Sequence, residues 1–195
     1  MHVQINVRPY EIRVSGYEES KEGWIGTLLT LANGRLSVRG VLELSNRRDK
    51  LSFFRGLYND IPIWHRELAV LPSINSVYLL NHGISEIKSI ERVLDMRRGI
   101  LSTNIVFNKR NYETKYFSVS LVNRGFKNLY MQKIKVLGEA ENYRVVLPIE
   151  DSMNPFLYGY TYTEHLIRED TYLSKHEIMS QYRIRGSGDK LLVKM

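Results

Sequence analysis

The amino-acid sequence predicts an all-β fold, a sandwich or a barrel, and three observations support this class. The chain of 195 residues contains 13 Tyr and 6 Phe, and aromatic residues, like β-branched ones, are favoured in strands. Glycine and asparagine turn signals recur at short spacing along the chain. The segments between these turns are short, and several of them alternate between apolar and polar residues. Short strands that recur about every 8–12 residues are typical of antiparallel sandwiches and barrels.

The clearest predicted turn is Asn33-Gly34, which lies between two apolar stretches, residues 25–31 and residues 35–44. An Asn-Gly pair between apolar stretches is the strongest short hairpin signal, because both central positions favour a positive φ. Residues 25–31 and 35–44 are therefore predicted to be paired strands.

Alternation and turn spacing predict the remaining strands. In residues 116–123 apolar side chains alternate with serines, which places the two kinds on opposite faces: Phe117, Val119 and Leu121 against Ser118 and Ser120. Further strands are expected at residues 76–80, 84–90, 101–107, 143–147 and 158–165. Residues 85–96 and 168–179 have a spacing that fits a helix or a strand, and we interpret both as strands from their context.

Composition excludes several classes of protein. Apolar residues make up 43% of the chain and charged residues 25%, as in folded soluble domains rather than disordered or collagen-like ones. The sequence contains no cysteine, which excludes disulfides, thiolate zinc sites and cysteine nucleophiles. No apolar stretch approaches the roughly 18 residues of a membrane span, and no secretory signal is expected. We expect a cytoplasmic protein with a single domain over residues 1–195 and no membrane partner.

The sequence carries no recognisable catalytic or metal-binding motif. The five histidines, at positions 2, 65, 82, 165 and 176, form none of the close pairs typical of metal sites. Neighbouring acidic residues such as Glu18 and Glu19 are interpreted as solvated surface charge. The net charge is +7, but the basic residues are dispersed, whereas a nucleic-acid site needs a basic stripe with aromatic residues. We expect no catalytic residue, no metal, no cofactor and no nucleic-acid partner.

One segment combines side chains that are suited to binding sugars. Trp64, His65, Arg66 and Glu67 place an aromatic ring, an imidazole, a guanidinium and a carboxylate in consecutive positions. We predict that they form a loop that faces carbohydrate or a protein partner. The alternative is that Trp64 packs over an edge of the core, with an ion pair between Arg66 and Glu67 beside it.

A second segment predicts structural ion pairing by Asp95, Arg97 and Arg98. Asp95 and Arg97 are two positions apart, so on a strand they share a face and can pair. Gly99 follows and permits a bend or a bulge before the next strand.

Four stretches in the first half of the chain resemble glycoside hydrolase family 65, which includes maltose, trehalose and kojibiose phosphorylases. Residues 33–43 are similar to its motif Asn-Gly-x-Leu-x-Val-Arg-Gly-x-x-Glu, and residues 55–58 to its Ala-Gly-x-Tyr/Phe stretch. Residues 67–72 resemble its Glu-Leu-Val-Asn-Leu-Pro, with Ala-Val in place of Val-Asn, so that Val70 replaces an asparagine. Residues 92–101 resemble its Arg-x-Leu-Asp-Met-Arg-Arg-Gly-x-Leu most closely. Beyond about residue 110 the resemblance is one of general β character only.

This resemblance implies the N-terminal domain of the family, a large antiparallel β-sandwich similar to the galactose-mutarotase fold. In the family that domain packs against a separate (α/α)₆ barrel that carries the catalytic glutamate, and this chain contains no counterpart of it. The resemblance therefore implies a non-catalytic accessory domain whose partners are a catalytic barrel, an α-glucosidic sugar and a second copy in a homodimer. A stand-alone carbohydrate-binding module is the alternative. An enzyme of mutarotase type, with His65 and Glu67 or His165 and Glu164 in its site, is a third hypothesis.

Overall fold

The computed structural model describes residues 2–45, 47, 49–61, 65–71, 74–79, 82–109, 112–138, 145–146, 166–173, 178–184 and 187–194. The chain divides into two compact units, which we describe separately. Unit 1 consists of Met1–Lys50 and Ile74–Pro148, and unit 2 of Leu51–Ser73 and Ile149–Met195. The single domain expected over residues 1–195 stays a prediction. Within the described residues, no helix is both long enough and apolar enough to span a membrane.

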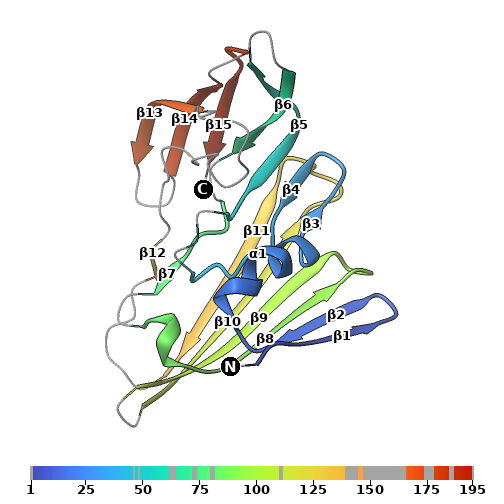
Figure 1. Ribbon diagram of the computed structural model, residues 1–195. Coiled ribbons are helices and arrows are strands. Elements are labelled where there is room, and N and C mark those ends of the chain that lie inside the picture. The colour runs from blue at the N-terminus through green and yellow to red at the C-terminus, as the bar shows by residue number, and fades with distance from the viewer. Residues whose placement is uncertain are drawn as a thin grey trace. The chain divides into compact units, whose positions relative to one another are not determined.

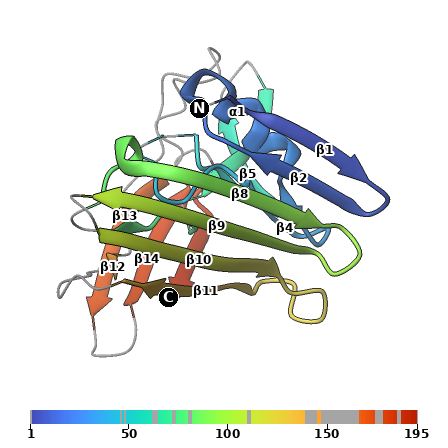
Figure 2. The ribbon, with the colours of Figure 1, turned by 90° about the horizontal axis from the view of Figure 1, so that it is seen from below.

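Unit 1 is built on a six-stranded antiparallel sheet with the order β1-β2-β8-β9-β10-β11. Figure 2 shows these six strands side by side in this order. Short connections join β1 to β2 and β8 to β9. The strands are β1 (Gln4–Arg8), β2 (Glu11–Ser15), β8 (Ile87–Asp95), β9 (Ile100–Lys109), β10 (Tyr112–Val122) and β11 (Tyr130–Leu137).

Helix α1 (Glu19–Leu28) and the short strands β3 (Leu31–Ala32) and β4 (Leu36–Val38) cover the inner face of this sheet. Figure 1 shows the three elements over the sheet. The core between the layers consists of buried apolar side chains that come from the sheet and from the segments above it. They are Leu42, Leu79, Ile90, Ile105, Phe107 and Tyr116. The short 3₁₀ helix η1 (Ile84–Glu86) precedes β8, and β7 (Tyr78–Leu79) pairs with β12 (Val145–Val146).

Helix α1 corrects the prediction of a strand at residues 25–31. Its sequence contains Gly23 and Gly26, which weaken an isolated helix, and its apolar pattern is poor. Tertiary contact explains both features. A Cβ on Gly26 would lie 2.3 Å from Cγ2 of Val41, and one on Gly40 would lie 2.3 Å from the carbonyl oxygen of Leu29. The two glycines allow the helix to approach the segment after β4 closely enough for Gly40 N–H to donate to Gly26 O at 2.9 Å.

The hairpin at Asn33-Gly34 is confirmed, with β3 and β4 paired on either side of it, but β4 ends at Val38 and does not extend to residue 44 as predicted. Of the two residues Asn33 and Gly34, only Gly34 has a positive φ, of 83°. The Asn33 side chain stabilises the turn, because its Oδ1 accepts hydrogen bonds from the backbone N–H of Arg35 at 3.0 Å and of Leu36 at 2.8 Å. Its Nδ2 donates to the carbonyl oxygens of Asn123 and Lys127, which ties the hairpin to the β10–β11 connection.

Unit 2 contains two sets of antiparallel strands. Strand β5 (Ser52–Ile61) pairs with β6 (His65–Leu71), and β14 (Ile178–Ile184) lies between β13 (Leu166–Leu173) and β15 (Lys190–Lys194). Its core includes the buried side chains of Ala69, Tyr182 and Ile184. Val70, at the position where the family motif has asparagine, packs instead in an apolar cluster with Leu51 and Phe53.

The prediction of an antiparallel β-sandwich fold is thus confirmed, as are strands in both ambiguous segments, at β8 and at β13 and β14. Strand β10 alternates as expected, but its buried face is the one that carries Tyr116, Ser118 and Ser120. Phe117, Val119 and Leu121 lie on the outer face instead. The predicted strand at residues 158–165 lies outside the described residues.

Candidate functional site

The predicted sugar-facing segment lies at the beginning of β6. Trp64 is outside the described residues. His65, Arg66 and Glu67 are the first three residues of the strand rather than part of a loop, since each pairs with a residue of β5. Alternation along the strand places Arg66 and Glu67 on opposite faces.

Arg66 forms an exposed plate with two residues of β5. Its Nε donates to Asp60 Oδ1 at 2.5 Å and its Nη2 to Asp60 Oδ2 at 3.2 Å. The guanidinium carbon also lies 5.5 Å from the ring centroid of Tyr58, within the range of a cation–π contact. An aromatic ring, a guanidinium and a carboxylate therefore share one solvent-exposed face, and we call these three residues the Arg66 plate.

Electrostatics keep the plate charged. The hydrogen bond from Arg66 lowers the pKa of Asp60, and the same bond raises the pKa of Arg66. The partner of Arg66 is thus a carboxylate across the strand pair. Glu67 points the other way and accepts from Nδ2 of the buried Asn59 at 3.3 Å.

Asp95, Arg97 and Arg98 form the turn between β8 and β9. The strand ends at Asp95, so alternation does not bring Arg97 to its face. Arg98 is the ion-pair partner instead, with Nε 3.5 Å from Asp95 Oδ2, and its backbone N–H donates to Asp95 Oδ1 at 2.9 Å. The guanidinium of Arg97 lies 5.0 Å from the ring centroid of Tyr10. These contacts order the corner of the sheet.

A buried ion pair that the sequence analysis missed joins α1 to the sheet. Arg92 donates to both carboxylate oxygens of Glu22, from Nη1 at 2.6 Å and from Nη2 at 2.7 Å, and the two side chains are 1% and 0% exposed. Glu22 Oε1 also accepts from the backbone N–H of Leu42 at 2.7 Å. Within the described part of the chain, Arg92 Nε has no hydrogen-bond partner. This pair is the polar centre of unit 1.

Glu43 forms a second buried polar cluster. Its Oε1 accepts from the hydroxyls of Tyr116, at 3.1 Å, and Ser118, and its Oε2 from Thr103 at 3.4 Å. Its backbone oxygen accepts from Lys50 Nζ at 2.7 Å. Burial and the Glu43 charge together raise the pKa of Tyr116, so this phenol stays protonated and donates to the carboxylate. The serine-bearing face of β10 is buried because it supplies these donors.

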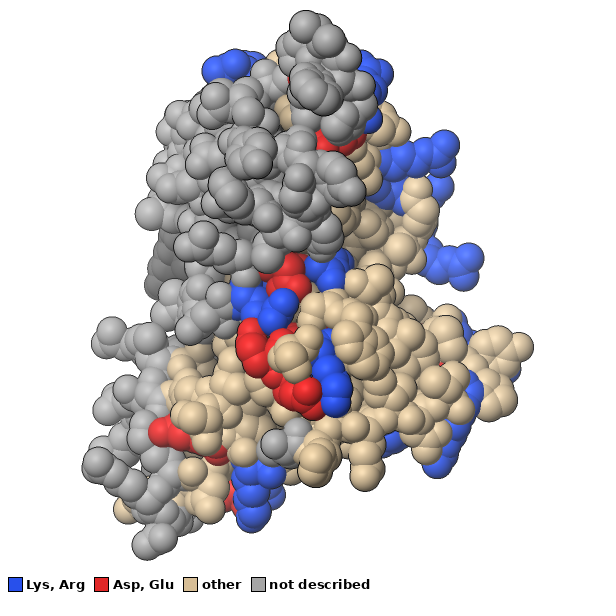
Figure 3. All heavy atoms as spheres, viewed as in Figure 1, with Lys and Arg blue, Asp and Glu red and all other residues tan. Residues whose placement is uncertain are grey.

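A third cluster of charges lies between α1 and the segment after β4. Arg47 donates to both oxygens of Asp49, at 2.8 and 2.9 Å, and to Glu19 Oε1 at 2.8 Å. Arg39 donates to Asp49 O at 2.9 Å and to Thr27 Oγ1 at 2.8 Å. Burial opposes ionisation of Asp49, but the hydrogen bond from Arg47 and the charges of both arginines outweigh it and lower the pKa. Figure 3 shows acidic and basic side chains gathered on the face that carries α1.

Two of the four family-like stretches, the first and the last, supply residues of these structural clusters. Arg39 and Glu43 belong to the first stretch, and Arg92 to the last, where Gly99 turns the chain with a φ of 66°. The resemblance marked these positions as family-like, yet their partners Glu22 and Tyr116 lie far away in sequence. Their roles could only be found from the structure.

The outer face of β10 and β11 is apolar and exposed. Val119 is 41% exposed, Met131 49% and Leu137 44%. Pairing places Val119 opposite Lys133 and Leu121 opposite Met131, and directly opposed residues of an antiparallel pair point to the same side. We call this surface, defined by Phe117, Val119, Leu121, Met131 and Leu137 with Lys115, Lys133 and Lys135 among them, the β10–β11 face.

In the described residues, no group of three or more histidine, aspartate or glutamate side chains is placed to hold a metal ion. The Arg66 plate and the β10–β11 face are the two exposed candidates for interaction.

Comparison with known proteins identifies relatives for most of the chain. The family model described as Glycosyl hydrolase family 65, N-terminal domain, matches residues 12–187. The kojibiose phosphorylase of Caldanaerobacter subterraneus subsp. tengcongensis is 27% identical over 143 residues, which make up 69% of this chain and 18% of the relative. A solved structure described as a putative kojibiose phosphorylase from the human microbiome has a TM-score of 0.81 at 14% identity, over 97% of this chain and 27% of that one. The chain thus spans less than a third of either relative.

Proposed function

Because the chain belongs to the N-terminal domain family of glycosyl hydrolase family 65, we propose that it is a non-catalytic accessory domain that supports a separate catalytic barrel. Relatives in which this domain covers 18% and 27% of the length have room for such a barrel. The proposed assembly is cytoplasmic and includes a homodimer. A cytoplasmic location and a single domain over the whole chain stay predictions.

Two observations favour a supporting role. The buried carboxylates of unit 1, Glu22, Glu43 and Asp49, are each hydrogen-bonded by arginine or hydroxyl donors inside the domain, so they serve its fold. The β10–β11 face is the main support for the proposal, since it exposes apolar side chains between lysines on a regular sheet surface, and exposed apolar surface is typical of sites of protein interaction. Its three lysines favour a partner surface with acidic residues around an apolar centre.

Replacement of Val119 and Met131 by lysine tests the supporting role. The catalytic region is either part of the same chain or encoded in a neighbouring reading frame. In both cases it is produced as a protein separate from this domain. The affinity between the two proteins is then measured by calorimetry. We expect the double variant to bind at least tenfold more weakly, because two charged side chains then face an apolar surface. The matched control is Asn108→Lys, at the exposed end of β9. Equal binding by the double variant and the control would reject the β10–β11 face as the docking surface.

Carbohydrate contact by the Arg66 plate is a second candidate function. It is favoured by the exposed face on which Tyr58, Asp60 and Arg66 meet, because aromatic rings and planar polar groups are the groups that contact sugar rings and hydroxyls. Trp64, His65 and Glu67 stay part of the predicted contact segment, but Glu67 points to the face opposite Arg66 and accepts from Asn59, so the proposed contact is centred on the Arg66 plate. The relatives are described as kojibiose phosphorylases, so α-glucosidic disaccharides are the proposed ligands.

Calorimetric titration with kojibiose, maltose, trehalose and starch fragments tests the sugar contact. We expect heat of binding with at least one of them and a tenfold loss of affinity in Arg66→Met, which removes the donors and leaves an apolar stem. Arg13→Met is a matched control in unit 1, because Arg13 is also paired with carboxylates, Glu11 and Glu91. The absence of heat with all four ligands, or an equal effect of both variants, excludes this function.

A further inference from the structure

The free edge of the six-stranded sheet has unusual properties for a natural edge strand. Within the described residues, β1 pairs with β2 only and lies at the end of the sheet. All five of its residues, Gln4-Ile5-Asn6-Val7-Arg8, are exposed. Edge strands are normally protected by lysines, proline or a bulge, whereas β1 has a single charge, at its last residue, and a regular register.

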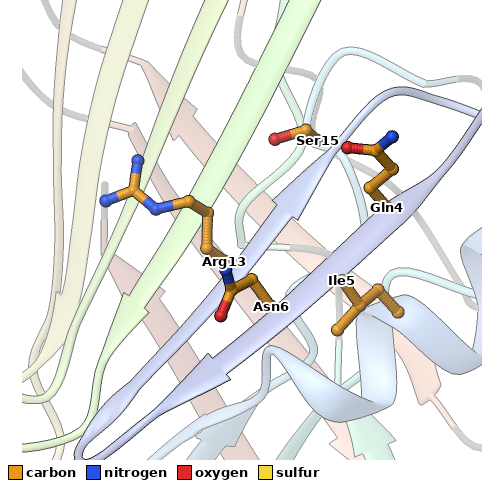
Figure 4. A pocket seen from close by; sticks show the side chains of 5 residues that line it. All are labelled: Gln4, Ile5, Asn6, Arg13 and Ser15. Carbon is orange, nitrogen blue, oxygen red and sulfur yellow. The ribbon is translucent and has the colours of Figure 1, made fainter.

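The side chains of β1 differ on its two faces. Ile5 and Val7 lie on the inner side of the sheet, opposite Val14 and Ile12 of β2, yet they are 37% and 66% exposed. Gln4 and Asn6 lie on the outer side, and together with Ile5, Arg13 and Ser15 they line a pocket. Figure 4 shows these five side chains, with Ile5 pointing in a different direction from Gln4.

The hydrogen-bonding pattern of the hairpin sets which backbone groups face the free edge. A two-residue turn joins β1 to β2, and the pair that closes it is Arg8 and Glu11. Residues in an antiparallel ladder alternate between those that bond to the neighbouring strand and those that point away. With Arg8 at the closing pair, Asn6 and Gln4 bond to β2. The N–H and C=O groups of Ile5 and Val7 therefore point to the free edge.

This pattern is self-complementary. When β1 meets a second β1 in antiparallel orientation with Asn6 opposite Asn6, each Ile5 lies opposite a Val7 of the other copy. These are the residues whose backbone groups face outward, so each Ile5–Val7 pair exchanges both hydrogen bonds. On the inner side the exposed apolar side chains cover one another. At the ends each Arg8 lies beside a Gln4, and the two arginines are about 14 Å apart at a rise of about 3.4 Å per residue.

We infer that β1 is the contact between two copies of this chain, joined edge to edge across a twofold axis at Asn6 into a continuous sheet. The inference rests on the homodimer included in the proposed function and gives it a location and a register. A second copy is the occupant that the observations favour, because the same five residues supply matching apolar, polar and backbone groups on both sides. A heterologous partner strand has no such reason to match this register.

Single cysteines test the register, since the natural chain has none. Asn6→Cys places the thiols of the two copies opposite each other. In the proposed register Asn6 and its counterpart form a non-hydrogen-bonded pair, in which the Cα atoms are about 4.5 Å apart, within the range of a disulfide. We expect Asn6→Cys to form a covalent dimer under mild oxidation. Gln4→Cys is the control, because its thiols lie about 14 Å apart in the same register. No cross-link at Asn6, or equal cross-linking at Gln4, overturns the inference.

Oligomeric state provides the second measurement. By sedimentation equilibrium the chain is expected to show twice its monomer mass of 22.9 kDa, and Ile5→Lys with Val7→Lys is expected to weaken the dimer at least tenfold. Asn108→Lys adds a lysine to an exposed position of β9, outside both proposed contact surfaces, and is expected to leave the dimer unchanged. Circular dichroism checks that all variants are folded. A monomeric wild-type chain removes both the dimer and the inference. If the β1 variants leave the dimer intact, the homodimer stands but its location at β1 is rejected. Binding to the catalytic region is measured in a separate experiment and is independent of either result.

Discussion

Replacement of Glu22 by alanine is expected to lower the free energy of unfolding by about 3–5 kcal/mol, because it leaves the guanidinium of Arg92 buried without its counter-charge. The two side chains are almost fully buried, and both oxygens of Glu22 are engaged. The backbone N–H of Leu42 loses its acceptor as well. Urea denaturation followed by circular dichroism measures the change.

Two variants control this prediction. Glu18→Ala removes a partly exposed glutamate at the start of the same helix, together with its ion pair to Lys21, and is expected to cost far less, because exposed ion pairs contribute little to stability. The double variant Glu22→Leu, Arg92→Met replaces the ion pair by apolar side chains and is expected to recover most of the lost stability, since a buried pair gains little over a well-packed apolar pair. A Glu22→Ala variant within about 1 kcal/mol of wild type would show that water reaches Arg92.

Replacement of Glu43 by alanine is expected to lower the free energy of unfolding by about 2–5 kcal/mol. It removes the acceptor of the Tyr116 and Ser118 hydroxyls, and each buried polar group left without a partner costs about 1–3 kcal/mol. Thermal and urea unfolding measure the loss.

Glu43→Gln is the matched variant, because it keeps one carbonyl oxygen as an acceptor, and a smaller loss is expected. A double-mutant cycle with Tyr116→Phe isolates the bond between the two side chains. Additive effects of Glu43→Ala and Tyr116→Phe would contradict the direct coupling that the structure shows.

Local signals in the sequence predicted much of the fold but little of the ion-pair geometry. Asn33 and Gly34 specify their hairpin because turn chemistry is local, and alternation specifies β10 in the same way. The spacing in β8 fitted a helix as well as a strand, and only its context favoured the strand. Helix α1 was missed because its glycines are tolerated only through contact with the segment after β4. Which face of β10 is buried depends on Glu43, a residue 73 positions away from Tyr116, and alternation alone carries no such information.

The candidate site illustrates the same limit. Arg66 was identified from its composition and neighbours, but its partner Asp60 depends on the register of β6 against β5. Likewise, Asp95 pairs with Arg98 because the strand ends there, and strand ends are poorly defined by sequence. The pair of Glu22 and Arg92 spans 70 positions, and no spacing rule connects them.

The discontinuous composition of unit 2 has a consequence for synthesis on the ribosome. Its first segment, Leu51–Ser73, emerges while unit 1 is still incomplete, and its remaining segment, Ile149–Met195, emerges only after unit 1 has been synthesised. The buried cluster of Ala69 with Tyr182 and Ile184 can therefore form only after the last two have been synthesised. At about 5–20 residues per second this delay lasts several seconds. During this interval β5 and β6 have no covering layer from their own unit, which makes the nascent chain a natural client for chaperones.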